Sequence, residues 1–566
     1  MKVWTYVRSL LSSAVADLAK KENIDFSSIS IQVEQPKFDT QGDFACPVAL
    51  GLARTLHRSP MSIAKEIVDL IGETPKGLKK IVIAPPGYIN IFVQPRTWFE
   101  MLQPLLKRPE DFTKSEVGAG KRVLIEFVSA NPTGPLHVGH ARGAILGDTL
   151  ATVMSAAGFA VQKEYYLNDR GNQMAALSAS VYARGRQAMG LDGDMPENGY
   201  KGSYITDIAK KIMDTPDGIA FNRPYTELGE PDSNVLALTA SRLLQEEIKK
   251  GLDELGIHFD HWFSERSLFR EKRVEQVLKT LRARGLLYEL PDGAILFKSE
   301  KFGDDQDRVV IRSNKLPTYF ASDIAYHDEK FKRGFDTLIN IWGADHHGYI
   351  PRMRAAMQAL DYNPDKMEIL LVQMVSLLMN GRPVTMGKRS GDYYTLSDLV
   401  REVGRDAIRF TFLTRKADAQ MEFDIDLARS QSMDNPVYYV QYGYARLMSI
   451  LARADTTIDA VDFDPELDTQ LQYPEERLLI KKAAMFPFTV EQAALTRQPH
   501  LIAFTLMDMV KSFHSYYTRY KTDKILSADP QKRAARLIMS AALARIIHSG
   551  LDLLGVSAPE VMKRED

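Results

Sequence analysis

The segment 126–148, EFVSANPTGPLHVGHARGAILGD, constrains the fold of this chain more than any other because it joins a strand, a turn and a helix. The apolar, β-branched run 123–128 ends where asparagine, proline and glycine residues break the pattern. A helix is then expected over about 138–157, with His137 and His140 three residues apart on one side of its first turn. The N–H groups and the positive dipole end of a helix N-terminus attract anions. The segment therefore predicts a phosphate-binding turn after a strand.

The same helix contains Gly139, Gly143 and Gly147, spaced four residues apart, so one of its stripes lacks side chains. Such a stripe admits either a flat nucleobase or a neighbouring strand, and packing against a sheet is the alternative explanation for the last two glycines. Two histidines three apart could also ligate a metal. The chain has 1 cysteine, Cys46, and no HExxH-type partner, so we expect no metal site and no zinc.

The composition of the 566 residues is that of an ordinary multidomain protein, with 45% hydrophobic and 26% charged residues. A single cysteine excludes a disulfide framework and fits a reducing compartment. The first residues have amphipathic helical spacing with charges throughout, unlike a signal peptide, and no apolar run of membrane-spanning length is apparent. These features predict a cytoplasmic protein that has no membrane partner.

The net charge of −1 hides an asymmetry near the C-terminus. Residues 436–476 carry 2 Lys or Arg against 8 Asp or Glu, whereas residues 477–566 carry 14 against 8. A local RNA-facing surface would produce this split, because phosphate contacts depend on local charge. A solvated helical face explains the basic segment equally well.

The order of patterns predicts an α/β fold with three domains. Residues 1–112 mix helix and strand, with a helix to Lys21, a helix through 53–71 and a strand pair over 79–93. Residues 118–433 alternate strand and helix as in a Rossmann-type parallel sheet, interrupted by an insertion at about 190–305. Long segments with apolar residues at helical spacing predict an all-helical bundle over residues 434–566. The expected strands of the second half of the sheet are 308–313, 336–342 and 366–377.

Eight blocks of sequence carry a resemblance to a known family. HVGH resembles the HIGH signature of class I aminoacyl-tRNA synthetases, and the wider pattern resembles the arginyl-tRNA synthetases in particular. The order and spacing of the blocks are far more specific than any one block. They are GDFACPVAL (42–50), PPGYINIFV (85–93), EFVSANPTGPLHVGH (126–140), YYLNDRGNQM (165–174), TYFASDIAYH (318–327), WGADHHGYIPR (342–352), FDIDLA (423–428) and DNPVYYVQYGYAR (434–446).

The resemblance implies an enzyme that ligates L-arginine to tRNA(Arg) with ATP and Mg²⁺ through an arginyl-adenylate, with activation that depends on tRNA, and that acts as a monomer. A small nucleotidyltransferase with the same HxGH site is a rival, but it would leave the helical C-terminal segment unexplained. Cysteine and methionine synthetases would carry zinc-ligating cysteines. A catalytically dead RNA-binding paralogue is favoured only by the degenerate second signature.

That second signature should resemble a KMSKS loop and here reads Thr385-Met386-Gly387-Lys388-Arg389. Lys388 aligns with the second lysine and would hold pyrophosphate, although an exposed loop lysine is the plain alternative. Arg389 is expected to supply the charge that Thr385 lacks, since a guanidinium grips phosphate with two donors. The resemblance implies catalysis by His137, His140 and Lys388. It implies ATP contacts at Pro132, Gly134, His137, Gly139, His140, Met386, Lys388 and Arg389.

A guanidinium substrate requires carboxylates in its pocket, because an unpaired buried cation is costly. The resemblance implies that Glu126, Tyr319 and Asp323 bind the guanidinium and that Asn131 binds the α-amino group. Local pairing of Tyr319 with Asp323 is the plain alternative. Asp345 or His347 is expected to line the same cavity, and Asn168 and Asp169 are expected to form its wall.

The resemblance also places tRNA on both terminal domains. Tyr88 and Asn90 match elbow contacts of the family, with a core tyrosine as the alternative, and aromatic stacking is a usual way to bind an unstacked base. Tyr444 and Tyr517 are the predicted stacking residues of the anticodon-binding domain. The chain ends APEVMKRED, where the family commonly has APERM near its end, so the terminal anticodon contact departs from the pattern.

Overall fold

The computed structural model describes residues 2–29, 31–230, 234–384 and 394–562. Its centre is a five-stranded parallel sheet, in which the chain runs outward from the middle strand to one edge and then returns to the other side. This is the order of a doubly wound nucleotide-binding sheet, so the expected Rossmann-type fold is confirmed. The strands lie in the order β11 (Met367–Val372), β10 (Thr337–Gly343), β4 (Arg122–Glu126), β5 (Ala160–Leu167) and β6 (His261–Ser264).

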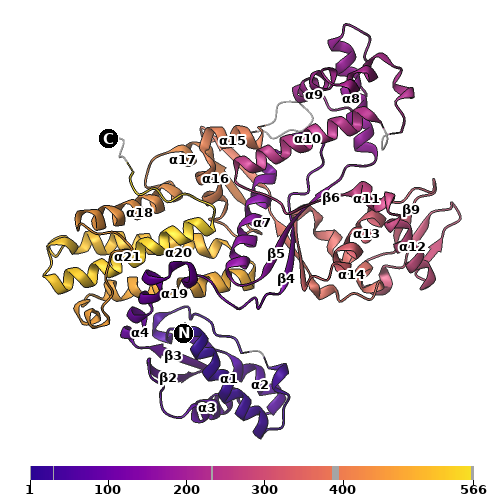
Figure 1. The fold of residues 1–566 in the computed structure, drawn as a ribbon. Helices are drawn as coiled ribbons and strands as arrows, with labels where there is room; N and C mark the ends of the chain where they lie inside the picture. The colour runs from indigo at the N-terminus through magenta and orange to yellow at the C-terminus, as the bar shows by residue number, and fades with distance from the viewer. Residues whose placement is uncertain (1, 30, 231–233, 385–393, 563–566) are drawn as a thin grey trace.

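Helices cover both faces of this sheet (Figure 1). On β4, Val123 and Ile125 belong to the core shared with α7 (Val138–Ala156), the helix predicted from the sequence. Leu124 points to the opposite face, against Phe331 of α13 (Tyr319–Lys332). α14 (Ile350–Ala359) then connects β10 to β11. Burial of both faces explains why β4 and β10 read as almost continuous apolar runs.

A helical insertion separates β5 from β6 and projects from the sheet at the top of Figure 1. It contains α8 (Asn172–Ala188), α9 (Ser203–Met213) and α10 (Val235–Glu254), with a short 3₁₀ segment, Pro216–Asn222, between the last two. Its apolar side chains form a core of their own, which includes Phe221. The insertion is therefore a small folded unit attached to the sheet.

Two sequence-based expectations about this region need correction. The range 190–305 is not one insertion, because β6 lies within it and pairs with β5 in the main sheet. Four residues are too few to show a strand pattern between the neighbouring helices α10 and α11 (Glu265–Arg270). The run RVVI is β9 (Arg308–Ile311), which does not join the main sheet. It forms a separate antiparallel sheet with β8 (Ile295–Phe297) and β7 (Leu287–Glu289), beside α12 (Arg273–Ala283).

The N-terminal domain packs α1 (Val3–Lys21) and α3 (Pro60–Ile71) with a three-stranded antiparallel sheet. The helix expected through 53–71 is two helices, because α2 (Val48–Leu56) ends at His57 in a left-handed conformation and Ser59 caps α3 before Pro60. The predicted strand pair is confirmed. The sheet order is β1 (Phe44–Cys46), β3 (Tyr88–Val93), β2 (Leu78–Ala84), and α4 (Pro95–Glu100), α5 (Leu102–Lys107) and α6 (Pro109–Phe112) lead to β4.

After β11 a small sheet in the order β13 (Arg382–Val384), β12 (Val375–Met379), β14 (Met421–Asp424) precedes the helical C-terminal domain. The connecting helices are α15 (Leu396–Val403), α16 (Arg405–Phe412) and α17 (Ile425–Arg429). The predicted bundle is confirmed as α18 (Pro436–Arg453), α19 (Pro474–Thr496), α20 (His500–Arg519) and α21 (Pro530–Leu553).

One helix of the described residues, α21, is long and apolar enough to cross a bilayer by length and composition alone. The sequence-based expectation found no such run. Most of this helix is buried, and side chains such as Ile538, Leu543 and Ile547 belong to the domain core. Packing of the bundle accounts for its apolar character.

Candidate active site

The HVGH turn, residues 137–140, begins α7 at the point where the strand order reverses between β4 and β10. His137 is the N-cap, and its Nδ1 atom accepts the Gly139 N–H at 3.1 Å. His140 Nδ1 accepts the His137 N–H at 3.3 Å. The ring centroids lie 3.9 Å apart. Because each Nδ1 atom accepts a backbone N–H, a neutral ring carries its proton on Nε2, which becomes the donor that each histidine can offer to an anion.

The three glycines of α7 have different surroundings. A Cβ atom on Gly139 would lie 2.9 Å from the His137 ring, so this position keeps the histidine pair in place. A Cβ atom on Gly147 would lie 2.3 Å from the Phe127 ring, which is the packing explanation. Nothing lies within 4 Å of such an atom on Gly143. Packing therefore explains only the last glycine of the stripe.

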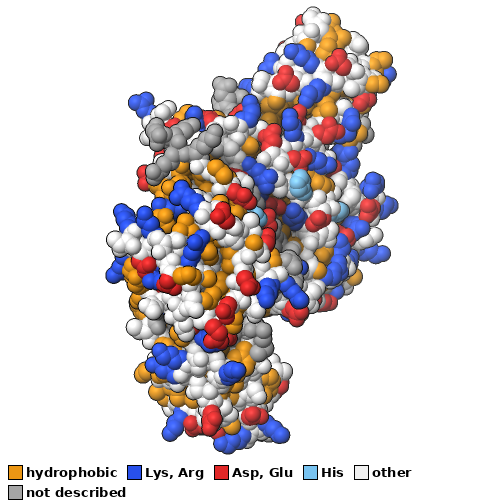
Figure 2. Space-filling view, turned by 60° about the vertical axis from the view of Figure 1, so that its left-hand side comes forward, with side chains coloured by type: hydrophobic (Ala, Val, Ile, Leu, Met, Phe, Trp, Pro, Cys, Tyr) orange, Lys and Arg blue, Asp and Glu red, His pale blue; other side chains and the backbone are white. Residues whose placement is uncertain are grey.

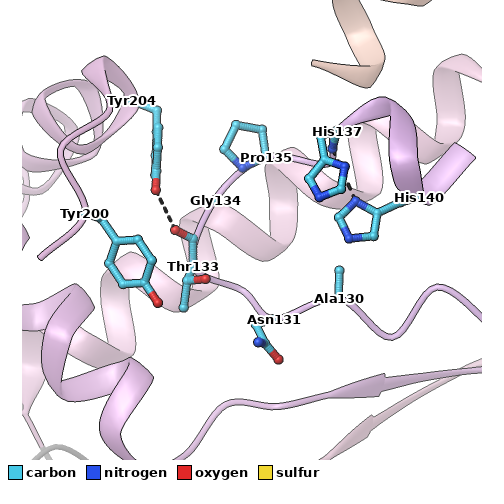
Figure 3. A pocket seen from close by; sticks show the side chains of 9 residues that line it. All are labelled: Ala130, Asn131, Thr133, Gly134, Pro135, His137, His140, Tyr200 and Tyr204. Carbon is cyan, nitrogen blue, oxygen red and sulfur yellow. Dashed lines mark hydrogen bonds between the residues drawn. The ribbon is translucent and has the colours of Figure 1, made fainter. Parts of the chain in front are cut away.

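A cavity opens beside the HVGH turn (Figure 3). Sequence reasoning missed two of its residues, Tyr200 and Tyr204, which come from the helical insertion. The Tyr204 hydroxyl donates to the Thr133 carbonyl oxygen at 2.8 Å, and so joins α9 to the loop after β4. Two tyrosines four residues apart at a helix start are the signal that could have pointed to them. The full lining is Ala130, Asn131, Thr133, Gly134, Pro135, His137, His140, Tyr200 and Tyr204, and Pro132 is buried beside it.

Glu126 is the last residue of β4 and is 7% exposed. Its Oε1 atom accepts from the Ser129 hydroxyl at 2.8 Å, and its Oε2 atom accepts from Lys330 Nζ at 2.5 Å. Lys330 is fully buried on α13 and also donates to Asn340 Oδ1 at 2.6 Å. The charge of Glu126 is therefore balanced by a lysine that the sequence pattern did not identify.

Asp323 lies two turns before Lys330 on α13. The Tyr349 hydroxyl donates to its Oδ2 atom, so Tyr349, rather than the exposed Tyr319, satisfies this carboxylate. Desolvation raises the pKa of Asp323 to about 7, opposed by the Tyr349 hydrogen bond and assisted by the charge of Glu126. The carboxylate therefore lacks a full counter-charge.

Glu265 is a second buried carboxyl group with a raised pKa. The sequence did not point to it, because it lies inside the expected insertion. It begins α11, is 4% exposed, and its Oε2 atom has no hydrogen-bond partner among the described residues. Burial and then the charge of Asp323 raise its pKa to about 7. Asp169 is also buried and accepts from the Ser264 hydroxyl at 2.6 Å.

These carboxylates form what we call the acidic cluster, which comprises Glu126, Asp169, Glu265 and Asp323. The charges of all four raise the pKa of the half-buried Tyr166, after desolvation, so all four lie near the Tyr166 hydroxyl. The Tyr166 N–H donates to Ser129 Oγ at 3.1 Å, and Ser129 in turn contacts Glu126. The cluster thus lies at the carboxyl ends of β4 and β5, where parallel α/β sheets bind ligands.

The remaining predicted residues differ in position. Asn131 lines the cavity, and the Asn168 Oδ1 atom is buried without a hydrogen-bond partner among the described residues. Asp345 and His347 are exposed in the 3₁₀ turn Ala344–Tyr349, which follows β10. The second signature, Thr385 to Arg389, lies outside the described residues, so Met386, Lys388 and Arg389 have no structural account. After it, the Leu396 N–H donates to the Leu136 carbonyl at 2.9 Å, beside the HVGH turn.

In the terminal domains, Tyr88 is half-buried and Asn90 is 7% exposed on β3. The prediction that Tyr444 stacks on a base is wrong, because its side chain is 2% exposed within the helical core. Tyr517 is half-buried under the Arg446 guanidinium, 4.3 Å from its ring centroid. Tyr517 and Arg446 line a groove of about 720 Å³ that reaches Glu560 near the chain end.

No group of three or more His, Cys, Asp or Glu residues is arranged to hold a metal ion in the part of the chain that the structure describes. The doubly wound sheet and the paired histidines at a helix start are the features of a class I aminoacyl-tRNA synthetase. Residues 102–422 match the model described as tRNA synthetases class I (R), catalytic domain. Residues 5–93 match the arginyl tRNA synthetase N terminal domain, and residues 440–562 match the DALR anticodon binding domain.

Curated relatives agree with these matches. The arginine–tRNA ligase of Syntrophotalea carbinolica is 44% identical over 94% of this chain and 95% of its own, and that of Oleidesulfovibrio alaskensis is 42% identical over 99% and 100%. The structure of Thermus thermophilus arginyl-tRNA synthetase, 24% identical, superposes with a TM-score of 0.74 over 98% of this chain and 100% of its own, which shows the shared fold. The chain belongs to the arginyl-tRNA synthetase family.

Proposed function

We propose that the chain ligates L-arginine to tRNA(Arg) in two steps that consume ATP. An arginine carboxylate oxygen attacks the α-phosphorus of ATP, and the bond from this phosphorus to the oxygen that bridges it to the β-phosphorus breaks. Pyrophosphate departs, and an arginyl-adenylate is formed. A ribose hydroxyl of the tRNA then attacks the arginyl carbonyl carbon, and AMP departs. The observation that carries the proposal is the acidic cluster, placed one loop away from the HVGH turn.

The charge balance of the acidic cluster favours a cationic substrate. Lys330 neutralises Glu126, whereas the pKa values of Asp323 and Glu265 are raised to about 7. Burial is the main cause for both, assisted by the charge of Glu126 at Asp323 and by the charge of Asp323 at Glu265. A planar guanidinium presents five donors and would satisfy both carboxylates at once. In this proposal the guanidinium is bound by Glu126, Asp323 and Tyr319, the residues expected from the sequence, together with Glu265. Asn131 binds the α-amino group, and His347 borders the pocket.

ATP would occupy the reversal point of the sheet. His137 and His140 donate to its phosphates, and Pro132, Gly134 and Gly139 allow the nucleotide to approach the backbone. Mg²⁺ arrives with ATP and neutralises phosphate charge as pyrophosphate departs. Met386, Lys388 and Arg389, outside the described residues, complete the predicted phosphate contacts.

Amino-acid-dependent exchange of pyrophosphate into ATP tests the proposal. We expect exchange with arginine and with no other standard amino acid, and only when tRNA(Arg) is bound. Absence of arginine-dependent exchange with cognate tRNA would leave the catalytically dead RNA-binding paralogue as the better description. Full exchange without RNA would contradict only the dependence on tRNA.

We propose three domains with the limits 1–112, 118–433 and 434–566. We also propose that tRNA contacts the first domain at Tyr88 and Asn90 and the last domain at Tyr517. The C-terminal helices face the viewer in Figure 2, where Lys and Arg side chains border apolar ones. This mixture suits an unstacked base held between phosphates. We also propose that the enzyme is monomeric and cytoplasmic. The single cysteine, Cys46, is buried and fits the reducing compartment.

Replacing Tyr517 with alanine is expected to weaken tRNA(Arg) binding by about 5- to 150-fold, the range for loss of one base–aromatic stack. The Kd can be measured by filter binding at fixed salt. Tyr444→Phe is the matched variant, because this tyrosine lies on the neighbouring helix but in the core, and it should leave the Kd unchanged. Equal effects of both changes would remove Tyr517 from the interface.

Replacing Lys388 with alanine is expected to lower kcat for exchange by about 100-fold while the KM for arginine changes little, since the lysine is proposed to stabilise departing pyrophosphate. Steady-state exchange rates at varied arginine and ATP separate the two constants. A parallel rise in the KM for arginine would show that this lysine has another role.

Replacing Tyr204 with phenylalanine removes the hydrogen bond to the Thr133 carbonyl and should slow exchange by about three- to tenfold, the equivalent of one net hydrogen bond. Tyr182→Phe is the control, because that hydroxyl donates to the Arg223 carbonyl at 2.7 Å elsewhere in the insertion. The measurement is the rate of pyrophosphate exchange of both variants at saturating substrates. An unchanged rate in the Tyr204 variant would show that this contact does not order the loop.

A further inference from the structure

Arg142 lies two residues beyond the HVGH turn and is 2% exposed. Its guanidinium donates to three backbone carbonyls, those of Lys416 at 2.6 Å, Ala419 at 2.7 Å and Gln373 at 3.0 Å. No salt bridge to it occurs among the described residues, and burial lowers its pKa, partly offset by the charge of Asp418. This is an unusual way to bury a cation, because carbonyl dipoles compensate a charge less well than a carboxylate does.

The position of Arg142 adds to this cost. It belongs to the second turn of α7, near the positive end of the helix dipole, where a cation is unfavourable. The fully buried Arg536 of the C-terminal domain shows the ordinary solution, since it pairs with Glu476 and Asp523. A buried cation at a helix N-terminus without such a partner raises the positive potential where an anion would bind.

The three carbonyls come from two separate segments. Gln373 follows the last residue of β11, at the carboxyl edge of the main sheet, and begins the connection to β12. Lys416 and Ala419 lie in the turn between α16 and β14. The Gln373 N–H also donates to the Ala417 carbonyl at 3.0 Å, so these segments already contact one another. Arg142 is the side chain that joins both of them to α7.

We propose that Arg142 is a positioning residue for the ATP-dependent step of the proposed reaction, on which this inference rests. Its planar fork fixes His137 and His140, at the start of α7, relative to the carboxyl end of β11. The start of α7 and the carboxyl end of β11, between which the nucleotide is proposed to bind, are thereby held at a fixed distance from one another. Its charge adds to the field that attracts the triphosphate. Arg142 acts through these elements, because its side-chain hydrogen bonds among the described residues all go to backbone carbonyls and none to the acidic cluster.

The test compares Arg142→Lys and Arg142→Gln with the unchanged enzyme. Lysine keeps the charge but cannot reach three carbonyls in a planar arrangement. We expect Arg142→Lys to lower kcat/KM for ATP in tRNA-bound exchange by about 100-fold, the order expected for a misplacement of about 1 Å, while the KM for arginine stays within about twofold. The Kd for a non-hydrolysable ATP analogue should rise by about tenfold, and more with glutamine.

The matched control is Arg186→Lys. Arg186 also donates only to backbone carbonyls among the described residues, those of Asp192 and Phe221, but lies on α8 of the insertion. It should leave both constants for ATP unchanged. Circular dichroism and thermal unfolding establish that each variant is folded. As a second route, guanidinium added to Arg142→Ala should restore part of the lost affinity for the analogue.

Two results would overturn the inference. One is an unchanged Kd for the ATP analogue in Arg142→Lys. The other is an equal loss of ATP and arginine affinity, which is what a general loss of structure would produce. Because analogue binding needs no reaction, it decides the role of Arg142 even if arginine-dependent exchange were absent in the unchanged protein. Failure of exchange alone would instead count against the proposed function.

Discussion

Replacing Asp323 with asparagine is expected to lower kcat/KM for arginine by about 100- to 1,000-fold in tRNA-bound pyrophosphate exchange. The change removes a buried charge that the proposed substrate guanidinium would pair with, and leaves that guanidinium with an incomplete set of acceptors. Folding should not suffer. The pKa of Asp323 is raised to about 7, so ionisation of this carboxyl group opposes folding and a neutral amide relieves that cost.

The sign of the pH dependence follows from the same shift. A carboxyl group whose folded pKa exceeds its unfolded value stabilises the fold below the unfolded pKa and loses that contribution as pH rises through about 7. The affinity for arginine runs in the opposite direction, because protonated Asp323 and Glu265 do not attract a cation. The KM for arginine should therefore rise as the pH falls from 8 to 6, and this slope should flatten in the asparagine variant.

Asp328→Asn provides the matched comparison. Asp328 is a buried aspartate on the same helix, but it bonds to Lys332 and to the Tyr362 hydroxyl away from the acidic cluster. It should leave the KM for arginine and its pH dependence unchanged. If Asp323→Asn also left both unchanged, the acidic cluster would not be the arginine pocket, and the main support for the proposed function would be lost.

The parts of the fold that the sequence predicts well are those with a local cause. The strand, turn and helix over 123–156 could be predicted because apolar periodicity, helix breakers and a helix start occur together. β6 was missed because HWFS is short and lies between helices. β9 was assigned to the wrong sheet because its apolar run is compatible with parallel and antiparallel pairing, and only its hairpin partner decides.

The candidate site divides in the same way. Glu126, His137, His140 and Asp323 occur in motif blocks, whereas Lys330 and Glu265 become their neighbours only through tertiary packing. The misassignment of Tyr444 was avoidable. Val440, Tyr444, Leu447 and Leu451 recur at helical spacing and form one buried face of α18, so the periodicity places this tyrosine in the core. Tyr517 lies on the partly exposed side of α20, so the same periodicity leaves its ring available for stacking on a base.

Lys330→Met is expected to destabilise the catalytic domain by about 3–5 kcal/mol, the usual effect of leaving one member of a buried ion pair without its partner. Glu126 would keep its charge at 7% exposure, with the Ser129 hydroxyl as its one remaining side-chain donor among the described residues. Lys332→Met, on the same helix, is the control. Its side chain is 56% exposed, and Asp328 keeps the Tyr362 hydroxyl as a donor, so that change should cost clearly less than Lys330→Met. Urea unfolding followed by a probe in the catalytic domain measures both.

The double change Glu126→Gln with Lys330→Met separates the role of Glu126 in the fold from its proposed role in arginine binding. Neither residue then leaves a buried charge behind, so the double variant should be more stable than Lys330→Met alone, and the two single effects should not add. Its stability should recover without recovery of activity, because the amide cannot replace the carboxylate toward a guanidinium. Additive losses of stability would show that the pair does not act as a unit. Recovery of arginine-dependent exchange would mean that Glu126 serves Lys330 and the fold, and that Asp323 and Glu265 carry the recognition of the substrate by themselves.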